Sequence, residues 1–223
     1  MKTIGILGGM GPLATIDFLG KLSKAAGTEC PRILMDLDPT IPSRTLAILG
    51  KGIDPGPRIL AGIRDLRCRG AEVIAVPCNS AYCWYPRGIA GAGWLNMPRA
   101  VSQALRCYPR VIILGGLATV SRFLYSDYLS DAQYLSPDDN ESIYKLIADI
   151  KLMPAPSTGM AARLAQIIGK YRDSCDAFLL ACTELSMIWP TNERGECLSF
   201  AGTPVVDSSW EYAKAVIAKA RED

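Results

Sequence analysis

Residues 73–82 have the sequence VIAVPCNSAY, in which an apolar run ends at a thiol followed by two small polar side chains. The apolar residues 73–76 predict a buried β-strand, and Cys78 stands where the chain leaves that strand. Residues 177–186, AFLLACTELS, repeat this pattern with Cys182 in the same place. The chain therefore carries two strand ends of the same form, each marked by a cysteine.

A second pair of matching stretches extends the repeat along the chain. TIGILGGMGP (3–12) and RVIILGGLAT (110–119) share an Ile-Leu-Gly-Gly core. The two Gly-Gly pairs are separated by nearly the same number of residues as Cys78 and Cys182. These two separations predict two similar halves, each with one strand that ends in Gly-Gly and a later strand that ends in a cysteine.

Apolar runs alternate with amphipathic stretches, which predicts a β-α-β-α-β order in the first half. This order is typical of parallel strands joined by right-handed crossovers. The expected fold class is therefore α/β, with two similar α/β domains, each a parallel sheet flanked by helices. The strands of the first half are expected at residues 3–9, 32–38 and 72–78, and its helices at 12–26, 54–70 and 79–90, with Pro86 limiting the last.

The end of the chain predicts a strand and a helix that return to pack on the first half. Asp207 or Ser208 is expected to cap this helix. Ligands of open parallel sheets bind beyond the carboxyl ends of the strands. If the two halves face each other, Cys78 and Cys182 reach one cleft from opposite sides, and the active site is expected between the domains. The domains are expected at residues 1–97 plus 205–223 and at residues 98–204.

Composition excludes several classes of protein. The chain has 223 residues, of which 49% are hydrophobic and 21% charged, as is ordinary for a soluble globular protein. The net charge of +2, without a long basic run, argues against a nucleic-acid partner. No apolar run approaches the roughly 20 residues of a membrane span, and the amino terminus predicts a strand and a turn rather than a signal peptide. We expect a cytoplasmic protein with no membrane partner.

Eight cysteines and no histidine limit the chemistry. No Cys-x-x-Cys pair is present, so the usual spacings of a zinc site are missing and no metal is expected. Without imidazole, a general acid or base has to be Cys, Asp, Glu, Lys or Tyr. A free thiol has a pKa of about 8.5, which the start of a helix lowers, and both repeated cysteines are expected at such helix starts.

Two thiols on opposite sides of one cleft suit racemisation or epimerisation. One thiolate removes a proton from a carbon, and the opposite thiol delivers a proton to the other face. Cys83 lies near this site, but the repeat does not pair it. The remaining cysteines are expected to be buried and inert, as most cysteines are: Cys30, Cys68, Cys107, Cys175 and Cys197.

Four motifs in their order and spacing carry a resemblance to a known family. GILGGMGPLAT, IPSRT, PCNSA and ACTEL, followed by VVDSSWEYA, resemble the aspartate/glutamate racemases, which need no cofactor. The resemblance implies two α/β domains, a homodimer, and a small acidic amino acid as substrate, with neither pyridoxal phosphate nor a metal. It implies an acid–base pair of Cys78 and Cys182. Its substrate-binding residues correspond to Met10, Arg44, Asn79, Ser80, Lys151, Thr183 and Glu184.

Within that set the resemblance gives separate tasks to different residues. Asn79, Ser80 and Thr183 would bind the α-carboxylate of the substrate. Arg44 would contact its side-chain carboxylate, which a planar guanidinium binds in a bidentate manner. Lys151 would assist Arg44, on a looser match to the family pattern.

The chain departs from the family pattern at four positions. Tyr82 stands where the family often has histidine, and Ala181 replaces the glycine before the second cysteine. Asp38 and Ser43 replace an asparagine and an aspartate around the IPSRT motif. Asp38 could disfavour a second substrate carboxylate or could orient Arg44. These changes leave the two cysteines in place and put the identity of the substrate in question more than the reaction.

Other functions remain open at the level of sequence. Relatives on the same scaffold include hydantoin-type racemases, malonate-type decarboxylases and maleate-type isomerases. A non-catalytic module that binds carboxylates in the same cleft is a further alternative, although such a module gains little from two thiols. The sequence does not decide between aspartate, glutamate and another acid, nor does it fix the pathway.

Overall fold

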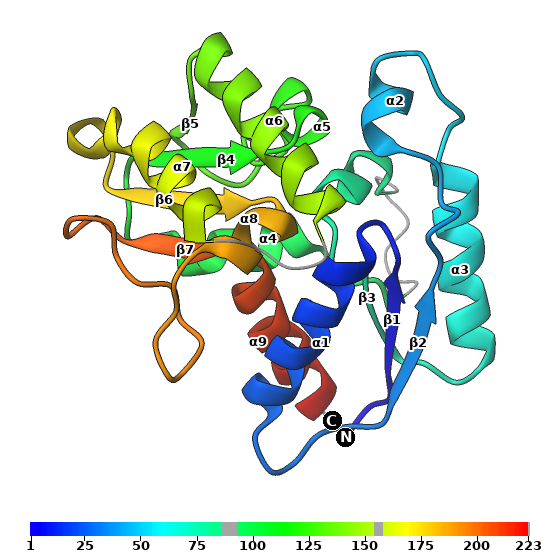
Figure 1. Cartoon of the computed structure of the whole chain (residues 1–223). Coiled ribbons are helices and arrows are strands. Elements are labelled where there is room, and N and C mark those ends of the chain that lie inside the picture. Colours follow the sequence, from blue (N-terminus) through cyan, green and yellow to red (C-terminus); the bar gives the residue numbers. More distant parts are fainter. Residues whose placement is uncertain (86–92, 154–157, 223) are drawn as a thin grey trace.

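A computed structural model describes residues 1–85, 93–153 and 158–222 of the chain. Two parallel β-sheets, each flanked by helices, form its two halves (Figure 1). This architecture confirms the predicted α/β fold class. The strands of the first sheet are β1 (Ile4–Gly8), β2 (Ile33–Leu37) and β3 (Val73–Ala75), and those of the second are β4 (Val111–Gly115), β5 (Ala132–Tyr134), β6 (Ala177–Ala181) and β7 (Val205–Asp207).

The helices that follow these strands agree with the predicted alternation. The predicted helix at 79–90 is a short 3-10 helix that ends before Tyr85, and positions 86–90 of that prediction lie outside the described residues. The helices are α1 (Pro12–Ala26), α2 (Arg44–Ile48), α3 (Gly56–Cys68), α4 (Met97–Ala104), α5 (Leu117–Ser121), α6 (Pro137–Leu152), α7 (Thr158–Gly169), α8 (Thr183–Ile188) and α9 (Ser208–Arg221), with 3-10 helices η1 (Asn79–Trp84) and η2 (Arg172–Ser174).

In both sheets, the order in which the chain adds strands reverses at the first strand of that sheet. In the first sheet the order is β2-β1-β3, so the chain moves to one side of β1 and then to the other. In the second the order is β5-β4-β6-β7, and the same reversal occurs at β4. Parallel sheets bind ligands at such switch points, beyond the carboxyl ends of the strands. Cys78 follows β3 and Cys182 follows β6, so each cysteine lies at a switch point.

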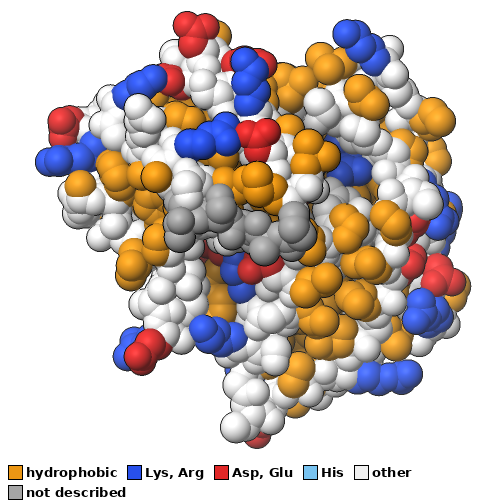
Figure 2. Space-filling model, in the orientation of Figure 1, with side chains coloured by type: hydrophobic (Ala, Val, Ile, Leu, Met, Phe, Trp, Pro, Cys, Tyr) orange, Lys and Arg blue, Asp and Glu red, His pale blue; other side chains and the backbone are white. Residues whose placement is uncertain are grey.

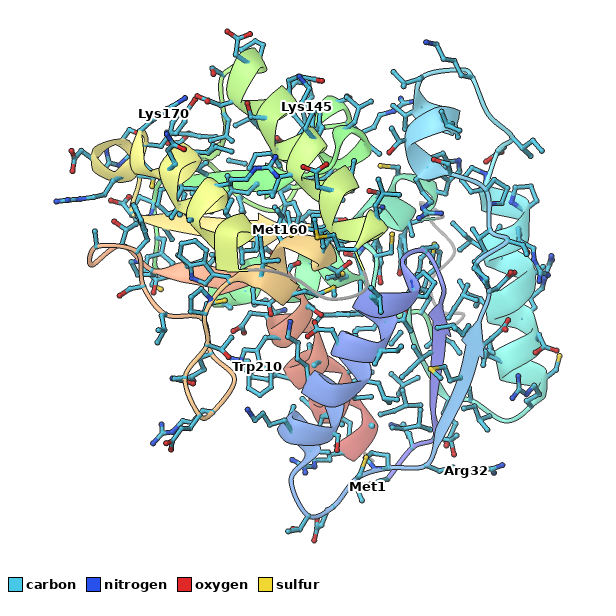
Figure 3. The ribbon with its side chains drawn as sticks, in the orientation of Figure 1. Met1, Arg32, Lys145, Met160, Lys170 and Trp210 are labelled. Carbon is cyan, nitrogen blue, oxygen red and sulfur yellow. The ribbon has the colours of Figure 1, made fainter. Side chains whose placement is uncertain are left out.

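Apolar packing fixes the two sheets within their layers. Ile4, Ile6 and Leu7 of β1 are fully buried, between α3 on one side and α1 with α9 on the other (Figure 1). In the second half, Met160 of α7 lies in the interior, whereas Lys170 projects from the surface (Figure 3). The buried strands are continuously apolar because helices cover both faces of each sheet.

The loop after β1 depends on glycine. Gly9 has φ +89°, a backbone conformation that residues other than glycine rarely adopt. A Cβ at this position would collide with the main chain of Asp38. The Gly9 N–H donates a hydrogen bond to Oγ1 of Thr15, in the first turn of α1. This tight turn brings Met10 and Gly11 to the carboxyl edge of the first sheet.

The carboxyl-terminal segment joins the two halves. β7 pairs in parallel with β6 and so belongs to the second sheet. The helix that follows, α9, packs against α1 of the first half, and both termini lie close together (Figure 1). Asp207 caps α9 by accepting a hydrogen bond from the Ser209 N–H at 2.7 Å, as one of the two predicted caps. The predicted domain limits themselves stay a prediction.

Within the described residues, no helix has the length and apolar character that crossing a membrane requires.

Candidate active site

The two repeated cysteines line one small cavity between the halves. Cys78 immediately precedes η1, and Cys182 immediately precedes α8. The cavity has a volume of about 70 Å³. Every residue predicted for the site lines it: Met10, Arg44, Cys78, Asn79, Ser80, Lys151, Cys182, Thr183 and Glu184. The fold thus brings together residues from five separate parts of the sequence.

A larger cavity of about 640 Å³ lies elsewhere, between η1 and the turn at residues 122–128. It is lined by Cys83 and Tyr82 but by neither of the paired cysteines. Burial raises the pKa of Cys83 to about 11, with a further contribution from Cys78. The chemistry of the paired cysteines therefore belongs to the smaller cavity.

Cys182 is held in its protonated form. Its Sγ donates a hydrogen bond to Oε2 of Glu184 at 3.0 Å. Burial raises the pKa of Cys182 well above its ordinary value, and the negative charge of Glu184 raises it further against the opposing effect of Lys151. The expectation that a helix start lowers this pKa is wrong for Cys182, because burial and a neighbouring carboxylate outweigh the dipole of the six-residue α8.

Lys151 supplies positive charge beside this thiol. Its Nζ lies 3.4 Å from Oε1 of Glu184, whose side chain is only 7% exposed. Partial burial acts to lower the pKa of Lys151, but the negative charges of Glu184 and of the two cysteines together outweigh it and raise the pKa. The residue, predicted on a loose match, comes from the last turn of α6 and reaches the cavity as an ammonium group.

Arg44 is held by main-chain carbonyl groups. Its Nη2 donates to the oxygen of Met10 at 2.5 Å, and its Nη1 donates to the oxygen of Pro42 at 3.0 Å and to that of Ile41 at 3.3 Å. Its Nε is buried and has no hydrogen-bond partner among the described residues. This unused N–H makes Arg44 a suitable partner for a ligand oxygen.

Asp38 does not orient Arg44, one of the two roles considered for it. Its carboxylate pairs with Arg58 at 2.6 Å and accepts hydrogen bonds from the hydroxyl and the N–H of Thr40. Burial acts to raise the pKa of Asp38, but these contacts outweigh it and hold the pKa below its usual value. The orientation of Arg44 comes instead from the carbonyl groups of its own loop and of Met10.

Asn79 is anchored by two residues that the sequence analysis did not assign to the site. The Tyr125 hydroxyl donates to Oδ1 of Asn79 at 2.5 Å, and Nδ2 of Asn79 donates to Oγ of Ser208 at 3.0 Å. An amide has two N–H donors, so one remains for a ligand in the cavity. Ser208 lies within the VVDSSWEYA motif, whereas no local signal in the sequence marks Tyr125.

Tyr82, at the family's frequent histidine position, is a core residue here. It is 5% exposed, and its hydroxyl accepts a hydrogen bond from the Trp94 indole N–H and lies 2.9 Å from the Tyr212 hydroxyl. Burial raises the pKa of Tyr82 well above its ordinary value. Tyr82 is not among the residues that line the cysteine cavity.

All eight cysteines are free thiols. The expectation of burial is wrong for Cys30, Cys68 and Cys107, which are exposed, and right for Cys175. Cys68 is the last residue of α3, and this end of the helix is exposed. Among the residues that the structure describes, no group of three or more His, Cys, Asp or Glu side chains is placed to hold a metal ion.

Comparison with known proteins places the chain in a family. The family model of the Asp/Glu/hydantoin racemases matches residues 7–216. The chain belongs to the Asp/Glu/hydantoin racemase family. It is therefore a racemase, as the motifs around Cys78 and Cys182 predicted.

Individual relatives agree over the full length of the chain. The broad specificity amino-acid racemase RacX of Bacillus subtilis is 26% identical over 229 residues, which cover 96% of each chain. The aspartate racemase of Picrophilus torridus is 30% identical, with a TM-score of 0.84 over 99% of this chain and 94% of that one. A glutamate racemase from Thermus thermophilus, 19% identical, shares the fold at a TM-score of 0.61 over 98% of this chain and 80% of that one.

Proposed function

We propose that the protein racemises an acidic amino acid, aspartate or glutamate, by proton transfer between Cys78 and Cys182, without a cofactor. One observation carries this proposal: two cysteines, contributed by different halves of the fold, line the same small cavity. The aspartate racemase of Picrophilus torridus, similar over nearly the whole chain, supports the choice of substrate class.

The protonation state of Cys182 sets the direction of the first transfer. Cys182 keeps its proton because its pKa is raised, so it acts as the acid. Cys78, as a thiolate, removes the α-proton from one face of the bound amino acid, and Cys182 delivers its own proton to the opposite face. The α-carbon inverts, Cys78 ends as a thiol, and Cys182 ends as a thiolate. No oxidant or reductant takes part.

The carbanion between these two steps needs stabilisation. The free N–H of Asn79, the hydroxyls of Ser80 and Thr183 and the main-chain N–H groups that begin α8 would hold the α-carboxylate, over which the charge spreads. Lys151 lines the cavity with both cysteines, and its positive charge acts to lower the pKa of Cys182. After transfer, its positive charge offsets the repulsion between the Cys182 thiolate and Glu184.

The side-chain carboxylate of the substrate would lie beside Arg44 and Met10. Arg44 has a buried Nε without a partner among the described residues, and a carboxylate oxygen would complete its hydrogen bonds. Met10 borders the cavity at the turn after β1 and excludes water from one side of it. Excluding water strengthens each of these polar contacts.

Exchange of the α-proton tests the proposal directly. Purified protein is incubated with L-aspartate or L-glutamate in heavy water, without added cofactor. The D- and L-products are then separated by chiral chromatography, and their masses are measured by mass spectrometry. We expect the D-product to carry deuterium at the α-carbon. Loss of an acid–base group typically lowers a rate by roughly 10²–10⁴-fold, so Cys78→Ala and Cys182→Ala should each reduce inversion by that much.

The exposed Cys107 offers a matched control, because Cys107→Ala removes a thiol remote from the cavity. It should keep full activity. Full inversion in either Cys78→Ala or Cys182→Ala would refute the two-cysteine mechanism. Binding of aspartate without exchange would instead indicate a non-catalytic carboxylate-binding protein, and release of carbon dioxide from a malonate would indicate a decarboxylase.

The homodimer and the cytoplasmic location stay predictions. Exposed apolar side chains occur on α1 and β2, among them Ile16, Met35 and Leu37, and Figure 2 shows hydrophobic side chains gathered over this part of the first half. Such a surface is typical of contact sites. Sedimentation analysis of the purified protein tests the dimer, for which the expected mass is twice that of one chain.

A further inference from the structure

We propose that this racemase also accepts amino acids with longer apolar side chains, of the size of leucine and methionine, and that a second cavity receives those side chains. This inference rests on the proposed function, since it assumes that the α-carbon lies between Cys78 and Cys182.

The second cavity adjoins the first and opens outward. It has a volume of about 360 Å³, compared with about 70 Å³ for the cysteine cavity. The two share a common wall, made by Met10, Ser43, Arg44, Lys151 and Glu184. A substrate side chain that extends from the α-carbon past these residues therefore enters the second cavity.

The side of the second cavity away from the shared wall is mainly apolar. Pro12 and Leu13 line it from the start of α1, Ile41 from the loop before α2, Ile150 from α6 and Met187 from α8. We expect the side chain of aspartate to end at the shared wall and to leave this surface in contact with water. Each methylene group that extends beyond the wall removes apolar surface from water on both the ligand and the protein, which favours longer apolar side chains.

The charges of the shared wall are already paired without a substrate. Lys151 is paired with Glu184 at 3.4 Å, and Arg44 donates three hydrogen bonds to main-chain carbonyl groups. A neutral side chain therefore leaves no uncompensated buried ion when it passes between them. Only Nε of Arg44 lacks a partner among the described residues and gives an acidic side chain an advantage.

This pairing limits the discrimination between acidic and apolar substrates. A site whose polar groups are left unpaired by the wrong substrate rejects it by about 10⁴–10⁵-fold. Here one N–H group of Arg44 is affected, so we expect leucine and methionine to react within roughly 100-fold of aspartate in kcat/KM.

The test compares exchange of the α-proton in heavy water for L-aspartate, L-alanine, L-leucine and L-methionine. Leucine and methionine should exchange faster than alanine, whose side chain does not reach the second cavity. If aspartate exchanges while leucine and methionine are more than about 100-fold slower, this inference is overturned and the proposed function stands. If no amino acid exchanges, the proposed function itself has failed.

Two variants that fill the second cavity connect the effect to this place. Met187 is half-buried and Leu13 is 37% exposed, and both line the second cavity but not the first. Met187→Trp and Leu13→Trp should each lower the ratio of leucine to aspartate kcat/KM at least about tenfold, the usual effect of one or two misplaced methylene groups in a pocket. Leu198→Trp is the matched control, because Leu198 is 48% exposed and lines neither cavity.

Thermal unfolding of each variant shows whether it is folded, and the two positions on separate helices keep the test valid if one variant is not. An unchanged ratio in a folded Met187→Trp or Leu13→Trp variant would overturn the assignment of the second cavity. A fall in the ratio in the Leu198→Trp control would do the same.

Discussion

The hydrogen bond from Tyr125 to Asn79 joins the two halves beside the reactive thiols, and Tyr125→Phe removes it. Tyr125 lies in the second half, after α5, and is fully buried. Asn79 directly follows Cys78 and is 3% exposed. The ring of phenylalanine fills the same space, so the change deletes the hydroxyl and leaves Oδ1 of Asn79 without its 2.5 Å partner.

The magnitude follows from the burial of that oxygen. A buried acceptor left unsatisfied costs about 1–3 kcal/mol, and water has little access to Asn79. For a chain of this length, each 1 kcal/mol lowers the unfolding temperature by roughly 2–4 °C, so we expect a decrease of roughly 2–12 °C. Without the hydroxyl, the amide of Asn79 keeps only its hydrogen bond to Ser208, so its orientation beside the cavity is held less firmly. We expect kcat/KM of Tyr125→Phe to fall about tenfold, which corresponds to a loss of about 1.4 kcal/mol in transition-state binding.

The assay combines thermal unfolding with exchange of the α-proton of aspartate. Tyr144→Phe is the control, because the Tyr144 hydroxyl has no hydrogen-bond partner in the described part of the chain, and it should leave both measurements unchanged. A double-mutant cycle with Asn79→Ala separates positioning from general packing. If Tyr125 acts through Asn79, the two changes are non-additive by more than about 0.5 kcal/mol. Additive effects, or a Tyr125→Phe protein with unchanged unfolding temperature and kcat/KM, would show the reasoning to be wrong.

Two further predictions concern buried charges. Glu184→Gln should lower the pKa of Cys182, measured by alkylation of that thiol at increasing pH. The raised pKa of Cys182 contributes stability below the unfolded value of about 8.5, and this contribution is lost as the pH rises toward the folded pKa. The variant should therefore lose less stability than the original protein above that pH. Lys21→Met should cost about 3 kcal/mol in urea unfolding, since it strands the fully buried Asp207 carboxylate 2.7 Å from the lost ammonium, whereas Lys145→Met, at an exposed pair, should change stability by less than about 0.5 kcal/mol.

An unshifted titration of Cys182 in Glu184→Gln would mean that burial alone raises its pKa. A Lys21→Met protein as stable as the original would mean that Asp207 takes up a proton, or is stabilised enough by its hydrogen bonds from Ser186 and Ser209.

The sequence by itself determined the elements of the fold and the membership of the site. Continuous apolar runs such as 111–115 and 177–181 form buried parallel strands because helices cover both faces of each sheet. The matched positions of Cys78 and Cys182 predicted that each lies beyond the carboxyl end of a strand in its own sheet, and that both reach one cavity if the two halves face each other.

Only the tertiary structure decided the environment of those residues. The pKa of Cys182 depends on burial and on Glu184, which outweigh the local effect of a helix start. Asp38 forms an ion pair with Arg58 rather than with Arg44, which is nearer in the sequence. Tyr125 forms a hydrogen bond with Asn79, 46 positions away in the chain. The second cavity is likewise built from four separate segments. Local patterns encode which residues form strands and helices, but contacts between side chains distant in sequence arise only when the packed sheets and helices bring them within a few ångströms.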